Sequence, residues 1–203
     1  MPLDGFVRYF RAGGGQLWER LALCKARVIV GSPTAAERAM AAVNASIYAR
    51  PWRPEDASEI LAMRRRLEES ASSDNLKRGV GGTMDAEFIV EMLVLKHGAS
   101  QPDIRYTGTI DALGALSDAG ILTLDDAVFF ATSYRFQRSV EARIRLMEAA
   151  GRHEFPDEEP EVEKLAFLLD YASADKLAKE IQEIRRETRA RFDRIFAAAA
   201  SSS

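Results

Sequence analysis

Residues 84–97 read MDAEFIVEMLVLKH, and this stretch decides the fold. Its apolar side chains would lie around most of the circumference of a helix, rather than along one stripe. A helix that is apolar on nearly all sides is buried inside a larger helical protein. We therefore expect a central buried helix from Met84 to His97, with Gly98 as its C-terminal stop.

Helical spacing continues outward from this stretch in both directions. Apolar residues recur every three or four positions in nearly every segment, and strictly alternating β-branched runs are almost absent. The sequence therefore predicts an all-α fold, a multi-helix bundle with a Gly-rich loop before the central helix. We expect residues 1–155 to form a helical bundle domain and residues 156–200 a C-terminal helical hairpin packed on it, making one domain overall.

Glycines, prolines and polar runs divide the bundle into separate helices. Residues 28–30 are predicted to be a short extended piece that is too short to establish a sheet. A solvated acidic linker is predicted at 155–160, and a solvated charged face that includes Arg185 and Arg189 on the last helix. The low-complexity C-terminus is expected to fray. The other expected helices are one ended by glycines 13–15 and those at 16–27, 34–48, around 60–67, 107–119, 123 to near Gly151, 161–171 and 174–199.

Composition excludes several classes of function. The 203 residues carry 28 Lys+Arg against 31 Asp+Glu, a formal charge of −3, so the chain has no general attraction for nucleic acid or anionic membranes. The lone Cys24 cannot form an internal disulfide, and two histidines cannot form a His-rich metal site. No signal peptide or membrane-length apolar stretch is present. We expect a cytoplasmic protein without nucleic-acid or membrane partners.

The most unusual local composition precedes the central helix. Glycines at positions 79, 81 and 82 follow Lys77 and Arg78, so backbone amides and the helix dipole could hold an anion such as phosphate. A purely structural turn explains the same composition. Asp85 and Glu87 come next, but carboxylates two residues apart on a helix point to different sides and form no paired site by themselves. A phosphate-loop motif, a nucleophile elbow and a histidine-based triad are all absent from the sequence.

Four blocks of this sequence resemble motifs of the bacterial glutamine synthetase adenylyltransferases. Residues 74–90 resemble D-[IL]-K-x-G-x-G-G-[IL]-x-D-I-E-F-x-V-Q, and residues 18–27 (WERLALCKAR) resemble W-E-x-x-A-L-x-[KR]-A-R. Residues 60–68 resemble I-R-x-M-[RK]-x-x-I-E, and residues 134–141 resemble Y-x-F-L-R-x-x-E. The resemblance spans residues 6 to 196. The departures are Val80, Ala86, Ala142 and Glu91, of which the last stands where the family has glutamine.

The resemblance implies the helical domain that follows a nucleotidyltransferase domain in each half of these enzymes. The catalytic domain bears a G-S-x-x-D-x-D motif, whose carboxylates hold Mg²⁺, whereas this chain has only Gly31-Ser32-Pro33 with no acid after it. We therefore expect the helical domain alone, excised or truncated, and inactive by itself, with no catalytic residue and no metal ligand. Its tail suggests the C-terminal, adenylylating half.

For the whole enzyme, the resemblance implies ATP-dependent adenylylation of a glutamine synthetase tyrosine, its phosphorolytic reversal, and the cofactors ATP and Mg²⁺. No cofactor is expected in this chain. The implied partners are the adenylyltransferase catalytic domain, glutamine synthetase and the PII signalling protein. The residues predicted to lie near nucleotide or the catalytic domain are Lys25, Arg27, Lys77, Gly79, Gly81, Gly82, Asp85 and Glu87.

Two other hypotheses stay open at this level. The chain could be a stand-alone helical interaction module that binds PII or glutamine synthetase without a catalytic domain in the same polypeptide. It also resembles, more weakly, the related helical region of the PII uridylyltransferases, which the block at residues 18–27 fits less well.

Overall fold

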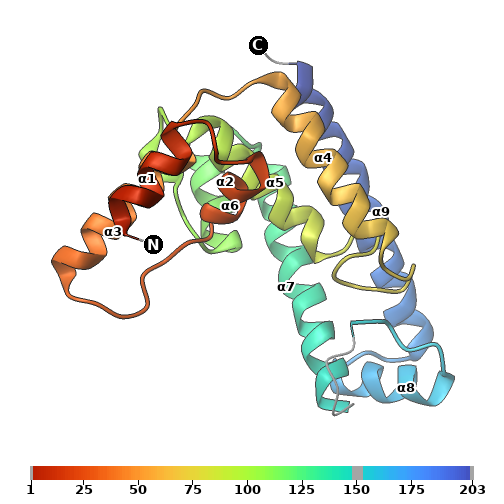
Figure 1. The fold of residues 1–203 in the computed structure, drawn as a ribbon. Helices are drawn as coiled ribbons and strands as arrows, with labels where there is room; N and C mark the ends of the chain where they lie inside the picture. The colour runs from red at the N-terminus through yellow and green to blue at the C-terminus, as the bar shows by residue number, and fades with distance from the viewer. Residues whose placement is uncertain (1, 148–152, 202–203) are drawn as a thin grey trace.

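The computed structural model describes residues 2–147 and 153–201. Within these ranges the chain forms nine α-helices, one short 3-10 helix and no strand, which confirms the all-α prediction (Figure 1). The elements are α1 (Leu3–Arg11), α2 (Leu17–Leu23), α3 (Pro33–Ile47), α4 (Pro54–Glu69), α5 (Thr83–His97), η1 (Pro102–Ile104), α6 (Thr109–Asp118), α7 (Leu124–Met147), α8 (Glu159–Leu168) and α9 (Ala174–Ser201).

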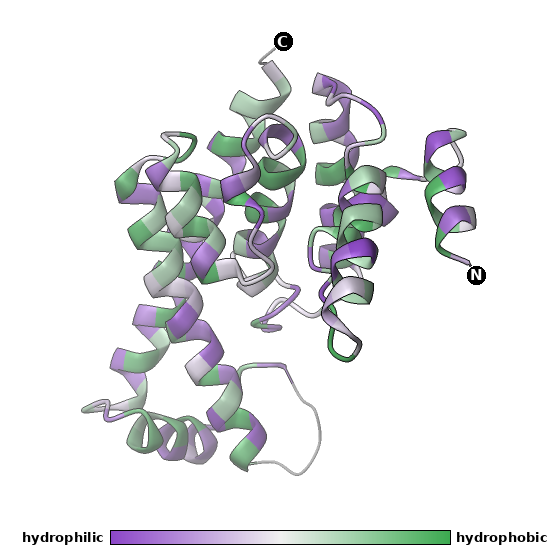
Figure 2. Cartoon of the chain, turned by 90° about the vertical axis from the view of Figure 1, so that its left-hand side faces the viewer, coloured by the Kyte–Doolittle hydropathy of each residue, from purple (hydrophilic) through white to green (hydrophobic). Residues whose placement is uncertain are grey.

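Helix α5 is the centre of the molecule, as residues 84–97 predict. Ten of its fifteen residues are buried, and it packs against α2, α4, α6, α7 and α9. Apolar residues from all of these helices form the main core around Ile89 and Met92, which are 0% exposed. Figure 2 shows hydrophilic and hydrophobic residues alternating along the surrounding helices, which is the pattern of helices that are apolar on one side.

The two longest helices, α7 and α9, extend beyond this core to the end of the molecule where α8 lies across them (Figure 1). A second, smaller apolar cluster fills that end, with Val140 and Ile144 of α7 packed against Leu165 of α8 and Leu177 of α9. Among the other elements, α4 packs along α9, and α1 packs on α3. The division of the chain at residue 155 stays a prediction.

Two helix ends differ from the sequence-based prediction. Helix α2 ends at Leu23 rather than Arg27, because the amides of Lys25 and Ala26 donate to the carbonyls three residues before them and so tighten the last turn. Helix α9 continues to Ser201 where fraying was predicted, because Phe196 and Ala199 are buried in the main core. The predicted end of α7 near Gly151 lies outside the described residues.

Residues 28–30 belong to no helix or strand, which agrees with the prediction of a piece too short to establish a sheet, and Ile29 and Val30 are 84% and 90% exposed. The acidic linker is not wholly solvated, because the Phe155 amide donates to the Asp74 carbonyl at 2.9 Å and its ring packs against the second cluster. A nearby isolated bridge joins Asn75 to Glu154. This segment therefore holds the start of the Gly-rich loop.

Candidate functional site

The Gly-rich loop before α5 is closed by its own hydrogen bonds. The Gly79 amide donates to the Asn75 carbonyl at 2.9 Å, and the Gly82 amide donates to the Gly79 carbonyl at 3.0 Å. The Gly81 amide donates to a carboxylate oxygen of Asp85, also at 2.9 Å. The amides that an anion would need are therefore already engaged inside the protein.

Glycine is required in this loop because other backbone lies against it. Gly81 has a φ of +69°, and a Cβ there would overlap the backbone carbonyl of Arg185 in α9. A Cβ on Gly82 would lie 2.6 Å from the Leu76 carbonyl oxygen. The Arg185 side chain completes the contact, since its guanidinium donates to the carbonyls of Val80 and Ser73. The loop is thereby fastened to the C-terminal helix.

A buried ion pair lies beneath the loop. Arg64 of α4 and Asp85 of α5 are both 0% exposed, and the Arg64 Nε donates to Asp85 Oδ1 at 2.6 Å. Arg64 also donates to the Gly79 carbonyl at 2.9 Å. Arg189 of α9 lies 3.8 Å from Asp85 and forms a 2.6 Å pair with Glu68 of α4. This network joins α4, the loop, α5 and α9.

Burial dominates the electrostatics of this network. Loss of solvation raises the pKa of Asp85 to about 6, although Arg64, Arg189 and the Gly81 amide oppose the shift. The carboxyl is nevertheless ionised at neutral pH, and its charge faces guanidinium groups on two sides. A carboxylate enclosed in this way fixes helices relative to one another and has no free face for a substrate.

The opposite side of α5 carries a second polar cluster, which is partly open to solvent. Glu87 accepts a 2.8 Å hydrogen bond from the Tyr134 hydroxyl of α7. Glu91, one turn further along, lies 3.5 Å from the ammonium of Lys25, which in turn donates to the Thr109 hydroxyl of α6 at 3.0 Å. As their spacing predicts, Asp85 and Glu87 point to different sides of the helix.

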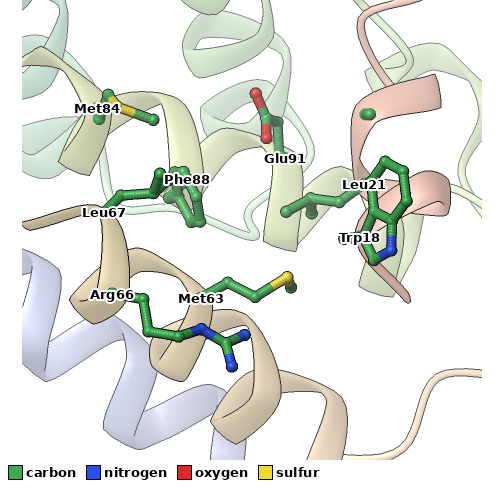
Figure 3. Close-up of a pocket in the computed structure, with 9 residues that line it drawn as sticks. Trp18, Leu21, Met63, Arg66, Leu67, Met84, Phe88 and Glu91 are labelled. Atoms are coloured by element: carbon green, nitrogen blue, oxygen red, sulfur yellow. The ribbon is translucent and has the colours of Figure 1, made fainter. Parts of the chain in front are cut away.

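An open groove lies beside this cluster, between α2, α4 and α5 (Figure 3). It has a volume of about 400 Å³, and Trp18, at 54% exposed, stands at one end. Met63 and Leu67 of α4 face Phe88 of α5 across it, as Figure 3 shows. Its remaining lining residues are Leu21, Ala22, Met84, Arg66 and Glu91. Three of the four motif blocks therefore contribute to its walls.

The structure brings together only some of the predicted site residues. Gly79, Gly81 and Asp85 meet in the buried network, and Gly82 is the N-cap residue that precedes α5. Lys25 and Glu87 belong to the polar cluster on the other side of α5. Lys77 contributes backbone hydrogen bonds to the loop. Arg27 lies in the exposed connection between α2 and α3 and has no partner among residues 2–147 and 153–201.

Sequence reasoning missed the arginines that bind the Gly-rich loop and Asp85. Arg64 lies in a motif block but was not predicted to be a site residue, and Arg185 and Arg189 were predicted to lie on a solvated face. The prediction for the two α9 arginines is wrong, because Arg185 donates to the Ser73 carbonyl beside the Gly-rich loop and Arg189 pairs with Glu68 of α4 at 2.6 Å. The spacing of residues in the sequence could have identified Arg185. Arg185 continues the spacing of the buried residues Ile181, Thr188, Phe192 and Ile195, which marks the core-facing side of α9.

Cys24 is expected to react slowly with alkylating reagents. Burial raises the pKa of its thiol to about 12, and the Sγ lies 3.5 Å from the Arg20 carbonyl. Since the thiolate is the reactive form, iodoacetamide at pH 8 should label the folded chain more than about a hundredfold more slowly than the urea-unfolded chain. Mass spectrometry of timed samples measures both rates. Equal rates would show that the thiol is freely accessible.

Within the described residues, no cluster of three or more His, Cys, Asp or Glu side chains could hold a metal ion. Nor does any described helix have the length and apolar composition that crossing a membrane requires.

The family model described as GlnD PII-uridylyltransferase matches residues 57–197. The chain belongs to this family. The bifunctional glutamine synthetase adenylyltransferase/adenylyl-removing enzyme of Mycobacterium tuberculosis is 36% identical over 163 residues, which are 78% of this chain and 16% of that protein. The enzyme of the same name from Agrobacterium fabrum is 27% identical over 203 residues, 97% of this chain and 20% of that protein.

These relatives confirm the resemblance to the glutamine synthetase adenylyltransferases, and the chain is a helical domain of that kind. The name of the family model also agrees with the kinship to PII uridylyltransferases that the sequence suggested more weakly. The chain spans about a sixth to a fifth of the length of the curated relatives it matches.

Proposed function

We propose that this chain is the non-catalytic helical domain that supports the catalytic nucleotidyltransferase domain of a glutamine synthetase adenylyltransferase and relays its regulatory state. The whole enzyme would transfer the adenylyl group of ATP to a tyrosine of glutamine synthetase, and remove it again, under the control of PII. Carboxylates of the catalytic domain, outside this chain, would hold Mg²⁺ against the triphosphate of ATP.

One observation carries this proposal: the motif residues Arg64 and Asp85 form an ion pair with no exposed surface. Catalytic carboxylates must reach metal or substrate, whereas this one is enclosed by Arg64, the Gly81 amide and Arg189. The glycine motif likewise serves the contact with α9. Residues of this kind hold helices in fixed positions, which is the role of a supporting domain.

Any contact of this chain with nucleotide or with the catalytic domain would be made by solvent-accessible side chains. The polar cluster on the outer side of α5 offers Lys25, whose side chain is 32% exposed, and the adjoining loop offers Arg27. The proposal also includes residues that shape the neighbouring loop, namely Lys77, Gly79, Gly81 and Gly82. Direct contact with a ligand has less support for these residues, because their backbone amides already donate hydrogen bonds within the protein.

The isolated chain is expected to transfer no label from radioactive ATP to glutamine synthetase in the presence of Mg²⁺. The physical reason is that nucleotidyl transfer needs clustered carboxylates around Mg²⁺, and the described residues contain no such cluster. A full-length adenylyltransferase serves as the positive control in the same assay. Transfer by the isolated chain above the no-protein background would refute the proposal.

A binding measurement distinguishes support from independent recruitment. Calorimetric titration of the isolated chain with PII, with glutamine synthetase and with a separately expressed nucleotidyltransferase domain should give heat only with the last. Tight binding of PII or glutamine synthetase without that domain would instead favour the stand-alone interaction module and overturn the supporting role.

A further inference from the structure

Three consecutive apolar residues are exposed in the connection between α2 and α3. Ile29 and Val30 are 84% and 90% exposed, and Val28 is 38% exposed. Figure 1 shows this connection as a long ribbon that leaves α2 and runs outside the helices before α3 begins. Single exposed apolar residues, such as Leu124 and Leu146 of α7, are common on protein surfaces. A run of three is a liability unless it meets a partner.

The backbone of this segment has no partner within the described residues. Neither the amides nor the carbonyls of residues 28–31 form a hydrogen bond with residues 2–147 or 153–201. The next carbonyl, that of Ser32, accepts a hydrogen bond from the Ala36 amide of α3. A segment with free amides and carbonyls is a template for pairing with another strand. Valine and isoleucine also favour the strand conformation that such pairing needs.

A β-sheet edge is the partner that satisfies such a segment. It offers a row of backbone donors and acceptors, together with pockets between the side chains of its apolar face. The body of a helix offers neither, because its backbone groups are bonded internally except at its ends. The part of the chain that the structure describes contains no strand, so the matching edge lies outside this part.

Size favours a domain of the same polypeptide over a separate molecule. Pairing of residues 28–30 buries much less than the roughly 1,000 Å² that a specific interface between separate proteins needs. Between two domains of one chain the effective concentration is of millimolar order, so a small contact can stay formed. The regions that match this chain make up 16% and 20% of the two relatives, so most of each relative lies outside them. The segment also follows directly the motif block at residues 18–27.

Resting on the proposed function, we propose that residues 28–30 add as a strand to the edge of a β-sheet in the catalytic nucleotidyltransferase domain. In this arrangement every second amide of the segment donates to the catalytic domain, and the apolar side chains cover the sheet beside it. The segment lies between α2, which ends at Leu23, and α3, which begins at Pro33. The added strand therefore fixes both helices to the domain that they support.

Hydrogen exchange at single-residue resolution tests the pairing, in the isolated chain and in the full-length adenylyltransferase that contains it. In the isolated chain the amides of residues 28–31 should exchange as fast as in an unfolded peptide, because they have no partner. In the full-length enzyme every second one should exchange at least about tenfold more slowly. Equal exchange in the two proteins, or equal protection of all four amides, would overturn the proposal. Protection that grows with the concentration of the isolated chain would show pairing between copies and would overturn the assignment to the catalytic domain.

A double variant tests whether the apolar side chains hold the segment in place. Ile29→Lys combined with Val30→Lys places a charge on both sides of the segment, since neighbouring side chains of a strand point to opposite faces. Lysine is a residue with which natural sheet edges avoid pairing. In the full-length enzyme this variant should return the amides of residues 28–31 to the exchange rates of the isolated chain. Circular dichroism should show an unchanged helix content, because both replaced side chains are exposed.

The matched control is Leu146→Lys combined with Phe167→Lys. It changes two apolar side chains of α7 and α8 that are 78% and 80% exposed, and it should leave the protection of residues 28–31 unchanged. Loss of protection in the control, or protection that persists in the variant of residues 29 and 30, would refute the pairing.

The outcomes for the pairing and for the proposed function are separate. If the isolated chain transfers no label but residues 28–31 stay unprotected in the full-length enzyme, the pairing is refuted and the supporting role stands. If the isolated chain itself transfers label, the proposed function fails, whatever the exchange of this segment shows.

Discussion

Replacing Arg64 with methionine is expected to destabilise the fold by about 3–5 kcal/mol, the range measured when one partner of a buried ion pair is removed. Arg64 has no exposed surface, and its guanidinium binds both Asp85 and the Gly79 carbonyl. Methionine fills a similar volume but donates no hydrogen bond, so Asp85 is left buried with less compensation. Urea unfolding followed by circular dichroism measures the loss.

The matched control is Arg65→Met, which changes the exposed neighbour on the same helix and should alter the free energy of unfolding by less than about 0.5 kcal/mol.

The pH dependence of the free energy of unfolding provides a second check. Without the guanidinium, the pKa of Asp85 rises further above about 6 in the folded state. A folded pKa above the unfolded value means that stability is gained as pH falls, so the deficit of Arg64→Met should shrink from pH 8 to pH 5. An equal deficit at both values would contradict the ion-pair interpretation.

Replacing Gly81 with alanine is expected to cost about 3 kcal/mol or more, of which about 1–2 kcal/mol is the strain of the left-handed backbone and the rest is steric overlap. The residue has a φ of +69°, and its Cβ would overlap the backbone of Arg185 in α9. The loop and α9 must then separate, which also strains the Gly81 hydrogen bond to Asp85. Thermal and urea unfolding measure the effect.

Gly120→Ala separates strain from overlap. Gly120 has nearly the same φ, +68°, but a Cβ there would have no neighbour within 4 Å. It should therefore lose only about 1–2 kcal/mol. Equal losses for the two variants would mean that the contact between Gly81 and α9 contributes nothing to stability.

The sequence was sufficient to predict the all-α class and the central helix. Those features depend on local periodicity, and α5 shows it in the strongest form, with apolar residues on nearly every side. Helix ends were predicted less well where tertiary contacts decide them. The terminal alanines of α9 look frayed in the sequence, yet Ala199 is buried against the core, and no local pattern reports that contact.

The site was harder to predict because its partners are distant in the sequence. Arg64 and Asp85 are separated by a whole loop, and Arg189 lies in the last helix. The resemblance singled out Asp85 and the glycines, but it could not distinguish a carboxylate that faces a ligand from one that faces a buried arginine. That distinction depends on burial, which only the arrangement of α4, α5 and α9 determines.

The contact between Gly81 and α9 also determines which substitutions positions 81 and 185 can accept during evolution. Gly81 touches the main chain of Arg185, which is the same for every amino acid. Selection on this contact therefore excludes every side chain at position 81 but, apart from proline, none at position 185. Among homologues, the glycine should be invariant without a covarying partner, so coevolution methods would miss one of the tightest contacts between the loop and the C-terminal helix.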